Sequence, residues 1–214
     1  MPAQKQKAKY LKLKILEMKN YFERQYNDGE RWMSYFYQID EILKLKPKNV
    51  LEIGVGNGLV SWYLKATGIK VATLDVNREL NPDFVSSVEK LPFGDSSFDA
   101  ILCAEVLEHL PFEKFPLALL ELKRASKKYV ILSLPHWGWT FRFCLKIPLL
   151  PPIRILWKIS SVLRHKPGEH QWEIGKRGFS LRKIKREINS AGFKILNDRI
   201  LFENPYHHFF ILEK

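Results

Sequence analysis

One short stretch, Val50-Leu-Glu-Ile-Gly-Val-Gly-Asn-Gly58, constrains the fold of this chain more than any other part of it. An apolar strand ends there in three glycines, and the segment that follows, 59–66, has the apolar spacing of a helix. Glycines allow a tight turn and let the main chain approach a ligand without a Cβ collision. The spacing is GxGxG, because Leu59 stands where the dinucleotide pattern GxGxxG has its third glycine. We interpret the stretch as a cofactor-binding turn, with a purely structural turn as the alternative.

Strand-like and helix-like segments alternate through most of the 214 residues, a length that suits one domain with a full core. Short apolar strands that alternate with helices predict a mostly parallel sheet covered on both faces. We therefore predict an α/β, doubly wound, Rossmann-like sheet of seven strands that ends in a C-terminal antiparallel hairpin. The predicted strands are residues 49–53, 70–74, 84–87, 98–103, 129–134, 193–202 and 207–212, and the predicted helices are residues 5–26, 30–45, 59–66, 112–125 and 180–191.

The pattern divides this single domain into four parts: two N-terminal cap helices (1–47), a core (48–135), an insertion (136–178) and a C-terminal helix with the hairpin (179–214). The insertion holds four of the six tryptophans and four prolines, and it has no clear strand pattern. We predict that it forms a helical lid over a substrate. Within it, residues 153–165 have the spacing of a basic amphipathic helix, suited either to an anionic membrane interface or to packing on the core.

The net charge of +12 is concentrated in three clusters within residues 5–19, 142–166 and 176–186. Such clusters attract the phosphates of nucleic acids, lipid head groups or substrates, and a solvated basic surface is the alternative. The N-terminal segment has no uninterrupted apolar core, and the two cysteines show no disulfide or zinc-ligand spacing. We therefore expect a cytoplasmic protein that can contact the inner face of a membrane.

Two further segments complete the pattern around the glycine turn. Asp75 follows the strand 70–74, where an acid can accept hydrogen bonds from both hydroxyls of a ribose. Beyond it lies Val88-Glu-Lys-Leu-Pro-Phe-Gly-Asp-Ser-Ser-Phe-Asp-Ala-Ile-Leu-Cys-Ala-Glu-Val-Leu-Glu-His-Leu110. Together the three segments, within residues 48–135, resemble the class I methyltransferases typified by the C-methyltransferases of ubiquinone and menaquinone biosynthesis (methyltransferase type 11). The resemblance implies S-adenosylmethionine as the cofactor and S-adenosylhomocysteine as its product.

The resemblance also implies a set of cofactor-binding residues, with the methionine part of the cofactor near the glycines and the ribose at Asp75. The implied residues are Glu52, Gly54, Gly56, Gly58, Asp75, Val76, Val88, Glu89, Leu91, Ala104 and Glu105, with Val106 beside them. The chain departs from the family at Ser87, where members commonly have an aspartate that accepts from the adenine amino group. A serine makes a weaker hydrogen bond there than a carboxylate would.

The expected chemistry is direct displacement of the methyl group, in which the enzyme contributes positioning and a suitable electrostatic environment. A hydroxyl acceptor also needs a base, and the candidates are Glu105, His109 and His136. His136 directly follows the strand 129–134, at the sheet edge where doubly wound folds bind ligands. His109 has a packing role as its alternative. The lack of regular ligand spacing predicts no metal site.

The acceptor itself is expected to be a small molecule that is lipid-linked or phosphorylated. Residues predicted to line its site, or to pack in the core instead, are Trp32, Tyr35, Trp137, Trp139, His170 and Trp172, with Tyr26 and Arg31 beside the cofactor. An RNA methyltransferase is an alternative that the charge favours, although no RNA-binding module is recognisable. An inactive membrane-surface or scaffold protein with the same fold is the alternative from another class. Fold analogy does not name the acceptor atom.

Overall fold

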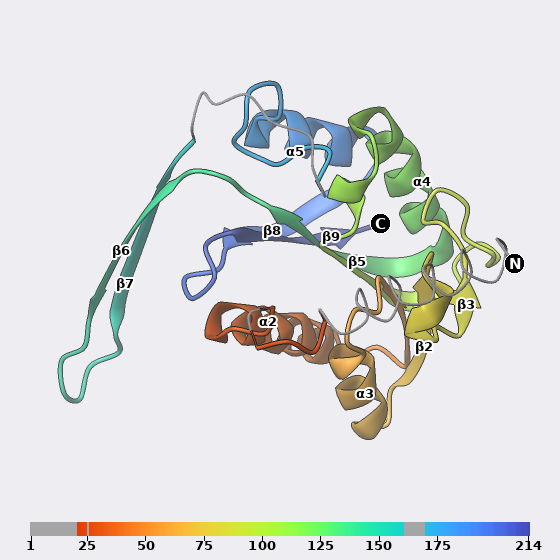
Figure 1. The fold of residues 1–214 in the computed structure, drawn as a ribbon, viewed down its shortest axis with the longest axis horizontal. Helices are drawn as coiled ribbons and strands as arrows, with labels where there is room; N and C mark the ends of the chain where they lie inside the picture. The colour runs from red at the N-terminus through yellow and green to blue at the C-terminus, as the bar shows by residue number, and fades with distance from the viewer. Residues whose placement is uncertain (1–20, 25, 161–169) are drawn as a thin grey trace, which may run out of the picture.

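The computed structural model describes residues 21–24, 26–160 and 170–214. A central sheet lies between two helical layers, with α2 and α3 on one face and α4 and α5 on the other (Figure 1). A two-stranded arm, β6 and β7, projects from one side of this body. The elements are α2 (Gly29–Leu45), β1 (Asn49–Ile53), α3 (Leu59–Ala66), β2 (Lys70–Asp75), η1 (Arg78–Leu80), β3 (Phe84–Val85), β4 (Phe98–Ala104), η2 (Leu107–His109), η3 (Phe112–Lys114), α4 (Phe115–Ala125), β5 (Ser126–Pro135), β6 (Trp139–Leu145), β7 (Ile153–Ile159), α5 (Leu181–Ser190), β8 (Lys194–Ile200) and β9 (His207–Glu213).

The main sheet has seven strands in the order β3-β2-β1-β4-β5-β9-β8. The strands β1 to β5 pair in parallel, whereas β9 pairs antiparallel with both β5 and β8. The predicted doubly wound sheet with a C-terminal antiparallel hairpin is therefore confirmed. The chain winds outward in opposite directions from β1 and β4, and the carboxyl ends of these two strands form the crevice in which such sheets bind ligands.

Local sequence accounts for the ends of the helices beside this crevice. The Asp28 side chain accepts a hydrogen bond from the Arg31 amide at 2.8 Å and so caps the start of α2. Lys46 takes a left-handed conformation after the last turn, and Pro47 cannot continue the helix. Gly58, also left-handed, stands directly before α3, so the glycine stretch leads straight into that helix.

Two apolar clusters fill the space on either side of the sheet. The larger contains an aromatic group in which the Trp172 ring lies 5.1 Å from both Phe112 and Phe115, measured between ring centroids. The Trp172 indole is fully buried and donates a hydrogen bond to the Leu110 carbonyl at 3.1 Å. Trp172 therefore belongs to the core, where it fastens the end of the insertion to the face that carries α4.

The insertion differs from the predicted helical lid, because residues 139–159 form the antiparallel hairpin of β6 and β7. Its apolar residues alternate with polar ones, for example Ile153, Ile155 and Trp157 around Arg154 and Lys158. Short apolar segments fit both a helical and a strand spacing, and β-branched and aromatic residues favour the strand. The strand 153–159 pairs with a different segment of the chain, which the local spacing of residues does not reveal. The prediction of a helix was therefore wrong for residues 153–159. The rest of the predicted helix, 161–165, lies outside the described residues.

The predicted helix 5–26 falls almost entirely outside the described residues. Its final part was wrong, since residues 21–24 and 26 form turns and a bend that lead into α2. The other predicted helices and strands lie within a few residues of the observed ones. Among the described helices, none combines the length and apolar character needed to cross a membrane.

The aromatic group predicts a large stability effect. We expect Trp172→Ala to lower the free energy of unfolding by about 3–5 kcal/mol, because it leaves a cavity among packed rings. Trp62→Ala is the matched control, since its indole is 65% exposed and its loss is expected to change stability by less than about 0.5 kcal/mol. Urea denaturation followed by circular dichroism measures both, and equal effects would contradict a core role for Trp172.

Candidate active site

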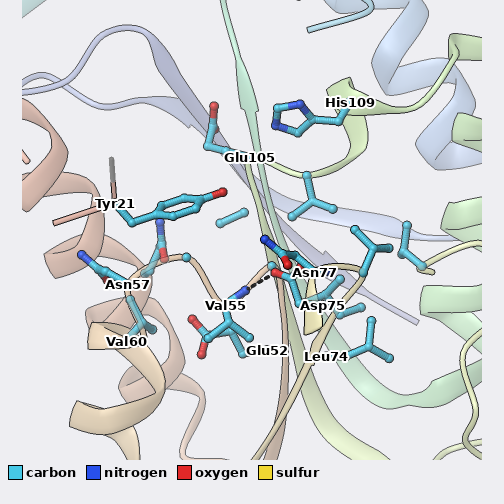
Figure 2. A pocket seen from close by; sticks show the side chains of 18 of the residues that line it. Tyr21, Glu52, Val55, Asn57, Val60, Leu74, Asp75, Asn77, Glu105 and His109 are labelled. Carbon is cyan, nitrogen blue, oxygen red and sulfur yellow. Dashed lines mark hydrogen bonds between the residues drawn. The ribbon is translucent and has the colours of Figure 1, made fainter. Parts of the chain in front are cut away.

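A cavity of about 580 Å³ lies at the carboxyl ends of β1, β2 and β4 (Figure 2). Its size is within the usual range for small-molecule and cofactor sites. In the view of Figure 2, Glu105 and His109 lie on one side of the cavity and Glu52 lies on the opposite side. Its lining residues are Tyr21, Tyr26, Arg31, Tyr35, Gln38, Glu52, Ile53, Gly54, Val55, Gly56, Asn57, Val60, Leu74, Asp75, Val76, Asn77, Ser86, Ser87, Val88, Ala104, Glu105, Val106, His109, Leu110, His170, Tyr206 and His207.

The floor of the cavity is the turn after β1. Gly54, Gly56 and Gly58 all have positive φ, at +84°, +55° and +74°. A Cβ atom on Gly54 would lie 2.4 Å from the Val106 side chain, so no larger residue fits while β1 and β4 keep this spacing. A Cβ on Gly56 would meet only the Tyr21 ring, at 4.0 Å. Gly54 therefore lets the turn pack closely against Val106, and Gly56 leaves the main chain open towards the cavity.

The Asp75 carboxylate at the end of β2 is held in place by main-chain hydrogen bonds. Its Oδ2 accepts from the Val55 amide at 2.9 Å, and its Oδ1 accepts from the Asn77 amide at 2.8 Å. The first of these bonds joins Asp75 directly to the glycine turn. A carboxylate can accept about four hydrogen bonds, so two acceptor positions remain for neighbouring hydroxyl groups. This arrangement fits the diol of a ribose.

Glu52 places a second carboxyl group in the cavity wall. The side chain is only 3% exposed, and its Oε2 has no hydrogen-bond partner among the described residues. Burial raises its pKa from an ordinary 4.5 to about 8, and hydrogen bonding to Ser61 offsets only part of that rise. A buried acceptor without a partner is costly unless a ligand satisfies it. Glu52 therefore suits a ligand that brings a positively charged group or a hydrogen-bond donor.

A third carboxyl group, Glu105, stands across the cavity at the end of β4. Its backbone has a φ of +54°, which is unusual for a residue with a side chain and costs energy. The Ser133 hydroxyl donates a short hydrogen bond of 2.5 Å to Oε1, and the His207 Nε2 lies 3.6 Å from Oε2. Burial raises the pKa of Glu105 to about 7, while the pKa of His207 falls to about 3. Glu105 therefore exchanges its proton near neutral pH beside an uncharged imidazole.

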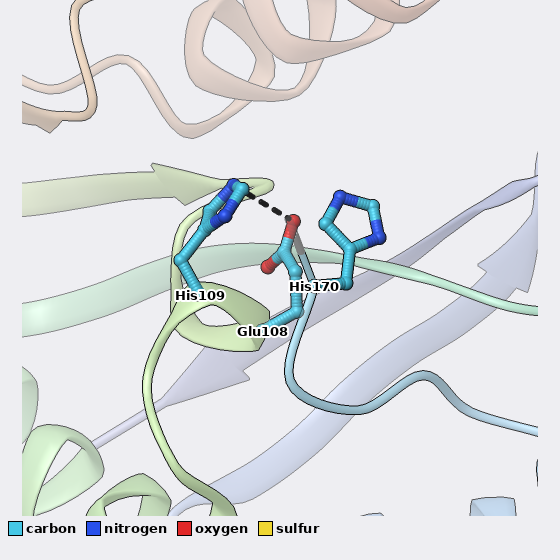
Figure 3. Close-up of side chains that lie close together, drawn as sticks. All are labelled: Glu108, His109 and His170. Carbon is cyan, nitrogen blue, oxygen red and sulfur yellow. Dashed lines mark ion pairs between the residues drawn. The ribbon is translucent and has the colours of Figure 1, made fainter. Parts of the chain in front are cut away.

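Glu108, His109 and His170 form a tight group (Figure 3). One ligand atom from each lies within 4.8 Å of the others, which is close enough to hold a metal ion. Both Glu108 oxygens are buried without a hydrogen-bond partner among the described residues, and burial raises the pKa of this group well above its ordinary value. A bound cation would reverse that rise. The ligand spacing was not visible in the sequence, because His170 lies far along the chain from Glu108.

Comparison with known proteins agrees with this geometry. Residues 51–134, which include the glycine turn, Asp75 and Glu105, match the family described as "Methyltransferase domain", type 11. This core is therefore similar to a class I methyltransferase domain. Ubiquinone biosynthesis O-methyltransferases are similar over part of the chain. The protein from Dechloromonas aromatica is 30% identical over 90 residues, and that from Coxiella burnetii is 32% identical over 87 residues. The matched part is 34% of this chain and covers only 38% and 37% of those relatives.

Solved structures share the fold of the methyltransferase domain over nearly the whole chain. A Burkholderia thailandensis 1,6-didemethyltoxoflavin-N1-methyltransferase, solved with bound 1,6-didemethyltoxoflavin and S-adenosylhomocysteine, matches with a TM-score of 0.60 and 12% identity. That match covers 98% of this chain and 89% of the other. A magnesium protoporphyrin IX methyltransferase from Synechocystis, solved with S-adenosylhomocysteine, gives a TM-score of 0.61 at 16% identity and covers 91% and 93%. At these identities the likeness establishes the fold alone.

The fold brings most of the implied cofactor residues to one cavity. Those that line it are Glu52, Gly54, Gly56, Asp75, Val76, Val88, Ala104 and Glu105, and Ser87 lies among them. Gly58 shapes the turn without lining the cavity. Glu89 points elsewhere and forms an ion pair with Lys114 at 2.9 Å. Leu91 is buried in the core, and its main chain is held by Glu121 and Arg124.

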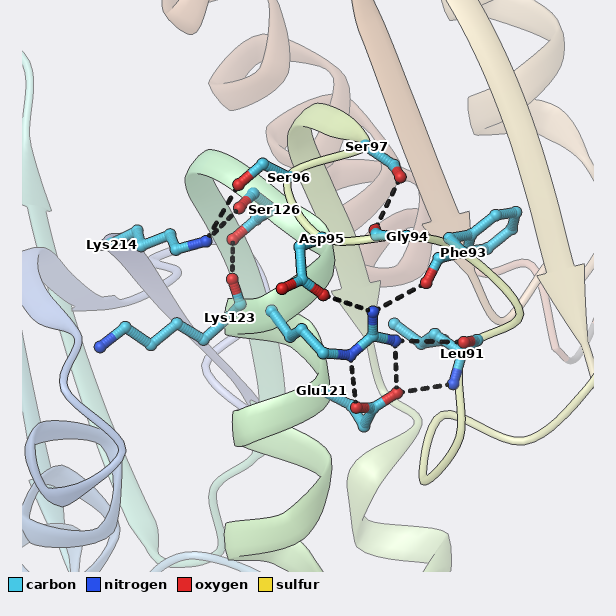
Figure 4. A network of polar contacts seen from close by, with 11 residues as sticks. Leu91, Phe93, Gly94, Asp95, Ser96, Ser97, Glu121, Lys123, Ser126 and Lys214 are labelled. Atoms are coloured by element: carbon cyan, nitrogen blue, oxygen red, sulfur yellow. Dashed lines mark hydrogen bonds and ion pairs between the residues drawn. The ribbon is translucent and has the colours of Figure 1, made fainter.

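The Leu91 segment belongs to a structural network at the far end of α4 (Figure 4). Arg124 pairs with Glu121 at 2.7 Å and also donates to the carbonyls of Leu91 and Phe93. These bonds lower the pKa of Glu121 and fasten the loop before β4 to α4. The Leu-Pro-Phe motif of the family resemblance is thus anchored here by main-chain contacts to α4, and Leu91 itself does not line the cavity.

The candidate acceptor-site residues divide between the cavity and other places. Tyr35, His109 and His170 line the cavity, whereas Trp32, Trp137 and Trp139 do not. His136 also lies outside the lining, because its ring is buried against His208, with 3.0 Å between the two Nδ1 atoms. Burial lowers the pKa of His136 to about 3. The geometry therefore favours Glu105 over His136 as the candidate base.

Sequence reasoning overlooked several residues that line the cavity, among them Asn57, Asn77, Tyr206 and His207. Asn57 had a local signal, since it stands inside the glycine turn, where its amide nitrogen donates to Tyr35 at 3.2 Å. Tyr206 and His207 had none. They reach the cavity because β9 is inserted beside β5, which brings the loop before β9 to the carboxyl end of that strand.

Glu52 leads to a prediction about pH. Between about pH 4.5 and 8 the folded protein keeps a proton on Glu52 that the unfolded chain releases, so the free energy of unfolding falls as the pH rises. Glu52→Gln should remove this pH-dependent loss of unfolding free energy, which is on the order of 4 kcal/mol. The stability of the variant relative to the wild type should therefore be greater at pH 8 than at pH 5. Denaturant melts across that range test it, with exposed Glu113→Gln as the control. An unchanged pH dependence in the Glu52 variant would contradict the raised pKa.

Proposed function

We propose that this protein transfers a methyl group from S-adenosylmethionine to a small acceptor that carries a hydroxyl group. The observation that carries the proposal is the bond between Asp75 and the glycine turn, which sets a ribose acceptor beside an open, Cβ-free main chain. The cavity has a suitable volume, and the orphaned carboxyl of Glu52 fits the amino group of the cofactor. The named activities of the relatives, all methyl transfers, support the same conclusion.

Each part of the cofactor has protein groups to hold it. Glu52 and the glycines would surround the methionine part, and Asp75 would accept from the ribose hydroxyls. Val76, Ser87 and Val88 would lie along the adenine, with Ser87 in place of the usual aspartate. Bound there, S-adenosylmethionine supplies an electrophilic methyl group and departs as S-adenosylhomocysteine.

The acceptor would occupy the side of the cavity that holds Glu105, His109, His170, Tyr206 and His207. These groups converge on one space, and the Tyr206 hydroxyl lies 3.4 Å from the His170 Nδ1. Tyr206 keeps its proton because burial raises its pKa. The neutral phenol of Tyr206 and the neutral imidazole of His207 can orient an acceptor hydroxyl through hydrogen bonds, while Glu105 removes its proton as the oxygen attacks. The positioning of both reactants then supplies much of the rate.

The class of the acceptor follows from the character of this space. Arg31 is the single cation among the lining residues that the structure describes. One guanidinium can pair with one phosphate or carboxylate, which suits a phosphorylated or lipid-linked small molecule better than an RNA backbone. RNA methylation remains the second candidate, and its support is the net charge of +12. Salt-dependent RNA binding would favour it, since phosphate contacts weaken steeply with salt.

Cofactor binding is the first test. We expect S-adenosylhomocysteine to bind the wild-type chain in isothermal calorimetry, and Asp75→Asn to weaken it about 10- to 100-fold, because hydrogen bonds to a carboxylate are replaced by weaker ones. Asp95→Asn is the matched control, since that side chain is 77% exposed and lies outside the cavity. No binding by the wild type, even at millimolar concentration, would contradict the proposed enzyme activity. It would favour the alternative of a scaffold protein with this fold.

Proton transfer by Glu105 is the second test, with a panel of small hydroxylated compounds as acceptors. The rate should rise with pH through about 7, where Glu105 loses its proton, and Glu105→Gln should lower kcat about 10²- to 10⁴-fold and abolish that rise. Ser133→Ala removes a bond that favours the charged form, so it should shift the rise to higher pH. A wild-type rate that EDTA abolishes and Mg²⁺ restores would instead assign deprotonation to a cation at Glu108, His109 and His170.

A further inference from the structure

The arm formed by β6 and β7 projects from the body (Figure 1), and it carries an apolar face that stays exposed among the residues that the structure describes. Residues that stand directly opposite each other in a hairpin point to the same face, and every second pair shares that face. Here these pairs are all apolar. They are Trp139 with Ile159, Phe141 with Trp157, Phe143 with Ile155, and Leu145 with Ile153. All eight side chains are between 37% and 71% exposed.

The connection between the two strands extends the same apolar character. Ile147, Leu149 and Leu150 are 42%, 103% and 55% exposed, and Lys146 is the single charged residue there. Eleven large apolar side chains therefore follow one another along the arm. Soluble monomers rarely expose a contiguous apolar patch of this kind, and one that exists marks a binding surface.

The opposite face of the arm carries its basic residues and contacts the body. Arg142 donates to the carbonyls of Phe202 and Glu203, and Arg154 pairs with the Glu203 carboxylate at 2.6 Å. Lys158 donates to the Pro205 carbonyl. These contacts set the orientation of the arm, with the basic face towards the loop 202–206 and the apolar face towards solvent.

Charge and chemistry identify the partner. Residues 136–160 include four lysines and arginines and no acidic residue. Three of these cations contact the body, whereas Lys146 is exposed at the tip of the arm, next to the apolar strip. A surface of anionic lipid has the complementary charge. Two tryptophans, Trp139 and Trp157, lie within the apolar strip near the base of the arm, and tryptophan favours the boundary between head groups and acyl chains. Two strands leave unpaired main-chain groups at their edges, which water and head groups can satisfy on a membrane surface but not inside it.

We propose that the β6–β7 arm docks the protein on an anionic lipid bilayer, with its apolar face buried at the boundary of head groups and acyl chains. The base of the arm contacts Pro205, next to Tyr206 and His207 of the cavity wall. Docking therefore brings the acceptor side of the cavity close to the lipid surface. The docking itself does not depend on methyl transfer, and its test needs neither cofactor nor acceptor.

The experiment is co-sedimentation of the full chain with vesicles of phosphatidylglycerol and phosphatidylcholine, or of phosphatidylcholine alone. We expect strong binding to the anionic vesicles, weakened by added salt, and weak binding to the neutral ones. Trp157→Ser and Leu149→Ser should each reduce partitioning about tenfold, because each removes one large apolar side chain from the buried face. Trp62→Ser is the matched control, since that indole is 65% exposed on α3 and should leave binding unchanged.

Several outcomes would overturn the proposal. Absence of binding to anionic vesicles is one, and an equal loss in the Trp62 and Trp157 variants is another. Light scattering tests a third outcome. If the protein is a dimer that Trp157→Ser dissociates, and it does not bind vesicles, the apolar face binds a second copy of the chain.

Lys146→Glu should weaken binding to anionic vesicles and leave binding to neutral vesicles unchanged. Circular dichroism melts check folding, and Leu149, being fully exposed, keeps one variant free of packing effects.

Discussion

The hydrogen bond from the Val55 amide to Asp75 connects the two parts of the chain on which the site depends. It spans the ends of β1 and β2 and holds the glycine turn against the edge of the sheet. Gly54 makes the bond possible, because any Cβ there would collide with Val106 and push the turn away from β4. The cavity floor, the position of the ribose acceptor and the start of α3 all follow from this one contact.

Buried carboxyl groups surround the cavity that this turn creates. Glu52, Glu105 and Glu108 all have pKa values raised by burial, and Glu105 also has a left-handed backbone. Each feature makes the folded protein less stable near neutral pH than apolar residues would. Such costs are concentrated at functional sites, where a ligand can offset them. The proposed cofactor would bring a cationic group to Glu52, and an acceptor hydroxyl would use the proton-accepting capacity of Glu105.

The arm and the cavity meet at the loop between β8 and β9. Lys158 of the arm contacts Pro205, and the next two residues, Tyr206 of the loop and His207 at the start of β9, line the cavity. A docked arm and a bound acceptor would therefore share one short segment of chain. This connection gives a physical reason for a lipid-linked acceptor, because the lipid and the reacting group would approach the protein from the same side.

The sequence by itself determined the class of the main sheet, the succession of most strands and helices along the chain, and the turn at Gly54 to Gly58, because these depend on local periodicity and on glycine conformation. It also pointed to Asp75 and Glu105 through their place directly after a strand. Only the tertiary structure decided the rest. In the structure, His136 stacks on His208, and Tyr206 and His207 line the cavity. His170 lies close to Glu108, and residues 139–145 pair with residues 153–159. Each of those depends on contacts between distant segments, and no local pattern in a single sequence encodes which distant segment a strand or side chain will meet.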